Sequence, residues 1–88
     1  NKMLNVDLAF MDANHQLDAT LRYFDAIVKK THSKSIVILD DIHQSQAMET
    51  AWKKIKSHTL VYCSIDLYRC GIVFFDPSLN NKHVVLQF

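Results

Sequence analysis

The sequence predicts a small α/β domain whose strands and helices follow the order β-α-β-α-β-β, with an antiparallel hairpin at the C-terminal end. The length of 88 residues suits one domain. The hydrophobic pattern alternates between strand-like runs and helical stripes in the first two thirds of the chain. The segment 35–39 is apolar and β-branched, which is typical of a central parallel strand. These observations predict parallel strands joined by right-handed helical crossovers.

The N-terminal half is expected to form two strands around one helix. Residues 5–11 are an apolar run that ends at Asp12, which predicts a strand buried on both faces. A helical period begins near Gln16, and residues 31–34 read as a short polar connection before the strand at 35–39. One helical stripe holds the apolar side chains Leu17, Leu21, Phe24 and Val28, with Ile27 beside them.

The C-terminal half is expected to form a helix and a hairpin. The helix runs from Gln46 to about Ser57, and its buried stripe consists of Met48, Ala51, Trp52 and Ile55. Residues 60–67 and 71–75 read as strands joined by a loop at 68–70. Residues 76–81 are a cluster of turn formers, and 83–88 are a last strand or an extended tail.

The composition excludes several classes of function. The chain has one glycine, Gly71, whereas a phosphate-binding or dinucleotide-binding turn needs several close together. Ten basic and nine acidic side chains give a net charge of +1 without a basic stripe, so nucleic acid is not an expected partner. We expect neither a signal peptide nor a membrane span. Cys63 and Cys70 are expected to be reduced, which predicts a cytoplasmic protein.

Acidic side chains follow the two predicted parallel strands. Asp12 ends the first strand, and Asp40 and Asp41 end the second. Neighbouring parallel strands end at the same edge of a sheet, where ligands of open α/β sheets bind. We therefore expect the three carboxylates to converge there.

Five segments carry a resemblance to a known family. Residues 10–15 (Phe-Met-Asp-Ala-Asn-His), 21–24, 37–43 (Val-Ile-Leu-Asp-Asp-Ile-His), 52–56 and 65–75 occur in the order of one motif set. Together they resemble the C-terminal half of a class I S-adenosylmethionine-dependent methyltransferase, in a subgroup related to O-methyltransferases. The resemblance implies a partial Rossmann-like sheet taken from the strand order 3-2-1-4-5-7-6, of which this chain supplies strands 4 to 7. The glycine-rich turn and the acid that hold the cofactor in that family have no counterpart within these 88 residues, so the sequence predicts a fragment.

The resemblance implies roles for several residues. In catechol-type relatives, the positions of Asp12, Asp40 and Asp41 bind Mg²⁺, and a basic residue at the position of His15 deprotonates the hydroxyl of a small-molecule acceptor. Two alternatives stand beside these roles. The acids can cap helices, or Asp12 can contact the cofactor without metal, and His15 can be a polar residue of the first helical turn. His43 either lines the same cleft as a weaker catalytic candidate or is a loop histidine bonded to a backbone carbonyl.

A second class of function remains open for the isolated chain. It can be a non-enzymatic α/β module that associates with itself. The strand over residues 5–11 is apolar and, without a further strand beside it, exposes unpaired backbone groups. The sequence therefore predicts a homodimer formed through this strand edge.

Overall fold

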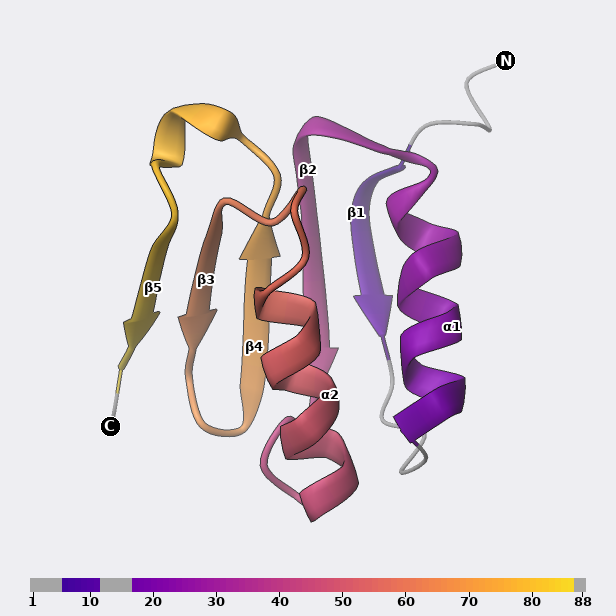
Figure 1. Cartoon of the computed structure of the whole chain (residues 1–88). Helices are drawn as coiled ribbons and strands as arrows, with labels where there is room; N and C mark the ends of the chain where they lie inside the picture. The colour runs from indigo at the N-terminus through magenta and orange to yellow at the C-terminus, as the bar shows by residue number, and fades with distance from the viewer. Residues whose placement is uncertain (1–5, 12–16, 87–88) are drawn as a thin grey trace.

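The computed structural model describes residues 6–11 and 17–86. These residues form five strands, two α-helices and one short 3-10 helix (Figure 1). The elements are β1 (Val6–Met11), α1 (Leu17–Val28), β2 (Thr31–Asp40), α2 (Gln46–Lys56), β3 (Cys63–Asp66), β4 (Cys70–Phe74), the 3-10 helix Pro77–Leu79 and β5 (Lys82–Val85). The predicted order of elements is confirmed, and part of the C-terminal tail is a strand.

The strands form one mixed sheet in the order β1-β2-β4-β3-β5. β4 is antiparallel to its neighbours β2 and β3, whereas β1 is parallel to β2 and β5 is parallel to β3. The protein is therefore an α/β fold with an antiparallel hairpin, as the sequence predicts. The carboxyl ends of β1, β2 and β3 lie at the same edge of the sheet, because these strands point the same way.

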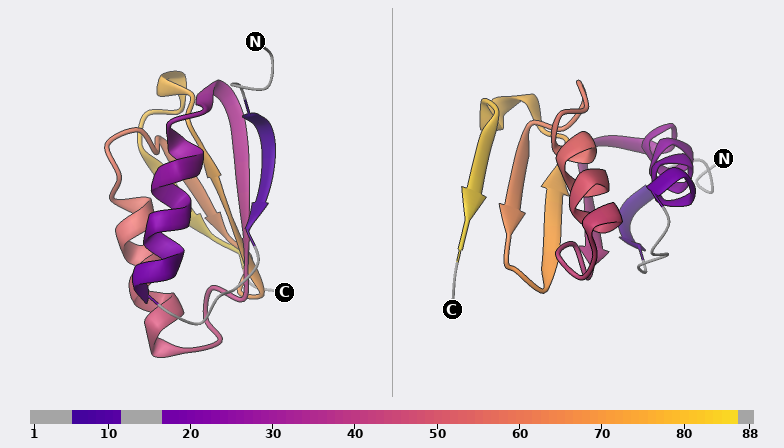
Figure 2. Two further views of the ribbon diagram at one scale, coloured as in Figure 1. Left: turned by 90° about the vertical axis from the view of Figure 1, so that its right-hand side faces the viewer. Right: turned by 60° about the horizontal axis from the view of Figure 1, so that its bottom comes forward.

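Both helices cover the same face of the sheet (Figure 2). The connections β1-α1-β2 and β2-α2-β3 both advance toward β5 along the sheet. Right-handed crossovers that advance in one direction place their helices on one side. The opposite side carries no helix within residues 6–11 and 17–86.

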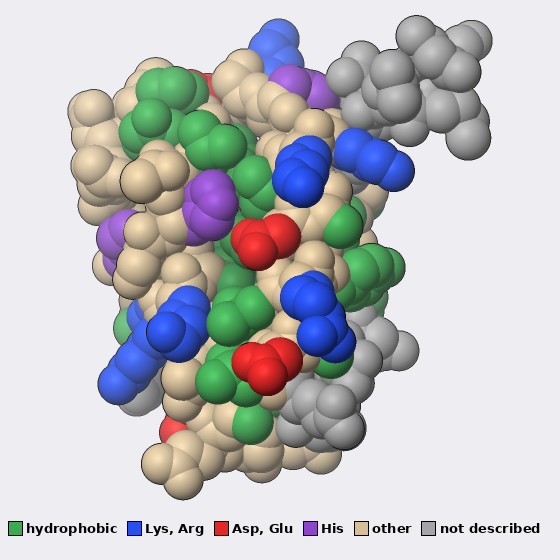
Figure 3. Space-filling model, turned by 45° about the vertical axis from the view of Figure 1, so that its right-hand side comes forward, with side chains coloured by type: hydrophobic (Ala, Val, Ile, Leu, Met, Phe, Trp, Pro, Cys, Tyr) green, Lys and Arg blue, Asp and Glu red, His purple; other side chains and the backbone are tan. Residues whose placement is uncertain are grey.

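The core lies between the helices and the sheet. Every residue of the predicted stripe of α2 is buried, and Phe24 and Val28 of α1 are buried with Thr20. Ser45 caps α2 by accepting a hydrogen bond from the Met48 N–H at 3.1 Å, which explains why the helix begins at Gln46. Phe75 stacks on Phe24 with ring centroids 6.4 Å apart. Viewed from the helix side, apolar side chains form a band between charged ones (Figure 3).

Two expectations about strands are wrong. Residues 31–34 are part of β2 and not a connection before it. Thr31 pairs with Val6 of β1, beyond an irregularity in the register of the two strands. This pairing is made by backbone groups, so it does not require apolar side chains at 31–34. The first strand is not buried on both faces. Leu8 is 65% exposed and Phe10 is 60% exposed, because α1 and α2 cover only the opposite side.

No helix in the described part of the chain is both long and apolar enough to cross a membrane.

Candidate functional site

Among the described residues, two polar turns meet at the carboxyl edge of the parallel strands: the turn after β2 and the β3–β4 hairpin. Met11 and Leu39 are register partners, so β1 and β2 end side by side as expected. The predicted site residues Asp12 and His15 lie outside the described residues. Asp40 is the last residue of β2 and Asp41 follows it, and the β3–β4 hairpin lies beside both through the pairing of Asp40 with Cys70 and the bond from the Asp41 N–H to the Arg69 carbonyl.

Asp41 turns the chain away from the sheet. Its φ of 55° is left-handed, a conformation that aspartate adopts more readily than most residues. The Asp41 N–H lies 2.8 Å from the carbonyl oxygen of Arg69 and 3.1 Å from Asp40 Oδ1. Tyr68, in the same hairpin, also has a left-handed φ of 71°. Two strained turns are thus joined backbone to backbone, and such strain is often concentrated at functional sites.

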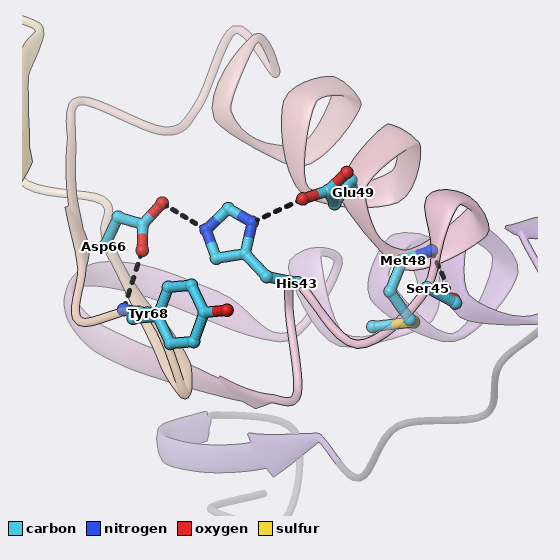
Figure 4. A network of polar contacts seen from close by, with 6 residues as sticks. All are labelled: His43, Ser45, Met48, Glu49, Asp66 and Tyr68. Atoms are coloured by element: carbon cyan, nitrogen blue, oxygen red, sulfur yellow. Dashed lines mark hydrogen bonds and ion pairs between the residues drawn. The ribbon is translucent and has the colours of Figure 1, made fainter.

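The loop after Asp41 places His43 between two carboxylates (Figure 4). His43 Nε2 lies 2.7 Å from Asp66 Oδ2, and His43 Nδ1 lies 2.9 Å from Glu49 Oε2. The other oxygen of Asp66 accepts a hydrogen bond from the Tyr68 N–H at 2.8 Å. The Tyr68 ring stacks on the His43 ring with centroids 5.4 Å apart. We call these four residues the His43 network.

The geometry of the His43 network favours a protonated imidazole. Two carboxylates can both accept hydrogen bonds from His43 only when both ring nitrogens carry hydrogen. Burial by itself lowers the pKa of His43, but the hydrogen bonds and charges of Glu49 and Asp66 outweigh it and raise the pKa above the ordinary value. An imidazolium held in this way donates to both neighbours and has no free nitrogen to accept a proton.

Asp66 is the more buried of the two carboxylates in the His43 network. Its side chain is 9% exposed, against 51% for Glu49. Burial by itself raises the pKa of Asp66. The hydrogen bonds from the Tyr68 N–H and His43, together with the positive charges of His43 and Lys56, outweigh burial, so the pKa of Asp66 lies below its ordinary value. Asp66 is therefore the ionised partner that fixes His43, and Glu49 is a more solvated second partner.

Two pockets share His43. One, of about 270 Å³, lies between α2 and β3, and Thr50, Lys53 and Lys56 contribute to its lining. The other, of about 230 Å³, is lined by Asp41, His43, Tyr68 and Arg69 among others. Both offer charged donors beside carboxylate acceptors, so each suits a small polar molecule rather than an apolar one.

The structure separates the predicted residues into two groups. Asp41 and His43 line the same pocket. Asp40 pairs with Cys70 and alternates with the buried Leu39, which places Asp40 on the side of the sheet away from the helices. Asp66 lies on the helix side, because it is buried and pairs with Gly71 beneath Trp52.

Asp66 and Glu49 were not predicted as site residues. The sequence around each residue gives little indication of a site. Asp66 is a single acid at the end of a strand. Glu49 lies in the first turn of a helix, where acids are common because they interact favourably with the helix dipole.

The described residues hold no group of three or more His, Cys, Asp or Glu side chains that could bind a metal ion. Asp40 and Asp41 supply carboxylate oxygens of the kind that Mg²⁺ prefers. Asp40 Oδ1 is already engaged by the Asp41 N–H. Two carboxylates do not complete a site, and the third predicted ligand, Asp12, is outside the described residues.

Comparisons of the chain with protein-family models, with curated proteins and with solved structures found no match.

Proposed function

We propose that these residues are the C-terminal half of a class I S-adenosylmethionine-dependent methyltransferase domain that transfers a methyl group to a hydroxyl of a small molecule. The observation that carries the proposal is the strand order. The resemblance implies the order 4-5-7-6 with strand 7 antiparallel, and β1-β2-β4-β3 has this order with β4 antiparallel. β5 extends the sheet beyond that pattern.

The location of the pockets also supports the proposal. Ligands of open α/β sheets bind beyond the carboxyl ends of parallel strands. Asp41 follows the carboxyl end of β2, and Asp66 is the last residue of β3. The pocket lined by Asp41, His43 and Tyr68 therefore occupies the position expected for a substrate.

The described residues would position a substrate rather than remove its proton. S-adenosylmethionine, when bound, supplies the methyl group. Both ring nitrogens of His43 are engaged by Asp66 and Glu49, so His43 orients its neighbours and is not free to act as a general base. The resemblance assigns the base to His15 and a cofactor contact to Asp12. Transfer at carbon needs mainly the alignment of donor and acceptor, which rigid turns provide.

We expect the 88-residue chain to bind S-adenosylmethionine no more tightly than millimolar. The glycine-rich turn that holds the cofactor in the proposed family has no counterpart in a chain with one glycine. Isothermal titration calorimetry measures this directly. A micromolar dissociation constant would show that the residues present make a sufficient site by themselves.

We expect Mg²⁺ at millimolar concentration to raise the melting temperature if Asp12, Asp40 and Asp41 converge, because a cation relieves their mutual repulsion. Asp40→Asn should abolish the increase, and Asp76→Asn, which lies toward the other end of β2 from Asp40, should not. The same increase in Asp40→Asn as in the unmodified chain would favour the alternative in which these acids cap helices.

The coding sequence on the amino-terminal side of Asn1 tests the proposed function. A strand closed by a glycine-rich turn is expected there, and the longer chain should transfer radiolabelled methyl from S-adenosylmethionine to a hydroxyl acceptor. An unrelated upstream sequence would contradict the proposal and favour the non-enzymatic module.

A further inference from the structure

A hollow of about 450 Å³ lies beside the C-terminal end of α2, and we call it the His83 hollow. It is lined by Lys53, Lys56 and Ser57 of α2 and by His83 of β5. Among the described residues, no Asp or Glu lines it. The Ser57 hydroxyl donates its hydrogen to the Lys53 carbonyl oxygen at 2.9 Å. The side-chain donors that remain for a ligand are therefore two ammonium groups and one imidazole.

His83 is oriented by a buried serine. Ser64 is 1% exposed and faces the helices, and its register partner in the parallel pair of β3 and β5 is His83, so both lie on the helix side of the sheet. Ser64 Oγ lies 2.7 Å from His83 Nδ1. When the Ser64 hydroxyl donates to Nδ1, or when the ring is protonated, Nε2 carries hydrogen. The contact thus holds the His83 ring and leaves Nε2 able to donate to a ligand.

The two lysines have no carboxylate within ion-pair distance in the described part of the chain. Glu49, one turn before Lys53, is bound to His43. Lys56 Nζ lies 5.5 Å from the centre of the buried Trp52 ring, which holds this charge close to the helix. Lys53 and Lys56 are three residues apart, so their side chains share one face of α2. An anion bound between them would remove the repulsion of the two like charges.

The His83 hollow adjoins the pocket between α2 and β3, because the same two lysines line both. That pocket, of about 270 Å³, adds the amide of Gln46, the hydroxyl of Thr50 and the two carboxylates of the His43 network. These groups form hydrogen bonds with neutral hydroxyl groups, whereas the carboxylates repel a second anion. An elongated ligand would therefore place its anionic end in the His83 hollow and its hydroxylated end near Gln46 and Thr50.

We propose that the two hollows together bind a phosphate monoester of a small hydroxylated molecule, such as a sugar phosphate. A phosphate group offers three strong acceptor oxygens and nearly two negative charges, which match two ammonium groups and one imidazole N–H. A carboxylate offers two oxygens and one charge. The aromatic side chain that lines the pocket, Trp52, is 2% exposed and presents no ring face on which a nucleobase could stack.

The two hollows lie away from the additional strands that the proposed function implies. Those strands would join the sheet beside β1, and β5 is at the opposite edge (Figure 1). Neither Asp41 nor Tyr68, which line the pocket proposed for the methyl acceptor, lines either of the two hollows. The inference therefore does not depend on the methyltransferase proposal.

The test is an NMR chemical-shift titration of the 88-residue chain at low ionic strength, where charges are least screened. Glucose 6-phosphate should shift the amides of residues 53–57 and 83 and also those of Gln46 and Thr50, with a dissociation constant on the order of 1 mM. Inorganic phosphate should shift only the amides of 53–57 and 83 and should bind several-fold more weakly. Glucose alone should give no saturable shifts.

Three variants identify the binding groups. Lys53→Gln and His83→Gln should each weaken the binding of glucose 6-phosphate about ten-fold, as expected when a hydrogen bond to a charged group is lost. Lys54→Gln is the matched control, because it removes the same charge from the next residue, which lines neither hollow. Its effect should be less than about two-fold. All three positions are exposed, so the fold should persist, and circular dichroism checks this.

Three results would overturn the proposal. Equal weakening by Lys53→Gln and Lys54→Gln would indicate non-specific attraction to a charged surface. Equal affinities for inorganic phosphate and glucose 6-phosphate would show that the pocket between α2 and β3 makes no contact with the hydroxyl groups. Shifts that do not saturate with either phosphate compound would show that the His83 hollow is not a binding site.

Discussion

Replacing Gly71 with alanine should lower the free energy of unfolding by about 1–3 kcal/mol, a sizeable part of the stability of a domain this small. A Cβ atom at Gly71 would lie 2.4 Å from Cη2, 2.6 Å from Cζ3 and 2.8 Å from Cζ2 of Trp52. These distances are far below van der Waals contact. Trp52 is 2% exposed and belongs to the hydrophobic core, so its ring can move aside only at the expense of core packing.

Urea denaturation followed by circular dichroism measures this cost. Cys70→Ala, one position away on the half-buried side of β4, is the matched control and should cost much less. A double-mutant cycle identifies the cause: in a Trp52→Leu background, Gly71→Ala should lose most of its effect. An equal cost in both backgrounds would show that the Trp52 ring is not what requires glycine at this position.

The role of Gly71 illustrates what the sequence can and cannot predict. The period of the apolar residues of α2 is enough to predict that Trp52 is buried, because a helical stripe must face the core. The single glycine excludes glycine-rich binding turns, and that inference needs only composition. The contact between Gly71 and Trp52 depends on how α2 crosses β4, and a local pattern contains no information about that crossing.

The same limit explains the error about β1. An apolar run predicts a strand, and the strand is present. Whether one or both of its faces are covered depends on which side of the sheet each crossover takes. The prediction of burial on both faces assumed a covering layer that the described residues do not supply.

The candidate site was predictable only in part. Asp41 and His43 follow a strand with a clear sequence pattern, and the structure places them in one pocket. Asp66 joins them from a segment 23 residues further along the chain, through a hydrogen bond to His43. Nothing in the sequence near Asp66 distinguishes it from an ordinary acid at the end of a strand, so only the folded hairpin identifies it.

Replacing Asp66 with asparagine should lower the free energy of unfolding by about 1–2 kcal/mol near pH 6, because a hydrogen bond between charged partners is lost at a buried side chain. Asparagine has nearly the same volume and can still accept the Tyr68 N–H, so the hairpin turn should persist. Glu49→Gln is the matched control, since Glu49 is half exposed and its bond to His43 is screened by solvent. Its cost should be a few tenths of a kcal/mol.

The effect of Asp66→Asn should depend on pH in a defined direction. The pKa of His43 is raised above 6.5 in the folded protein, so its stabilising contribution is complete below about pH 6.5 and is lost as the pH rises through the folded value. The pKa of Asp66 is lowered below 3.8, so its contribution is complete above about pH 4 and is lost as the pH falls through the folded value. The difference in unfolding free energy between the unmodified chain and Asp66→Asn should therefore be largest between about pH 4 and 6.5 and should shrink at alkaline pH.

An NMR titration of the His43 ring should show its pKa above 6.5 in the unmodified chain and lower in Asp66→Asn. An unchanged pKa in Asp66→Asn would mean that Asp66 does not hold the proton on His43, and the His43 network would then be a packing contact without electrostatic consequence.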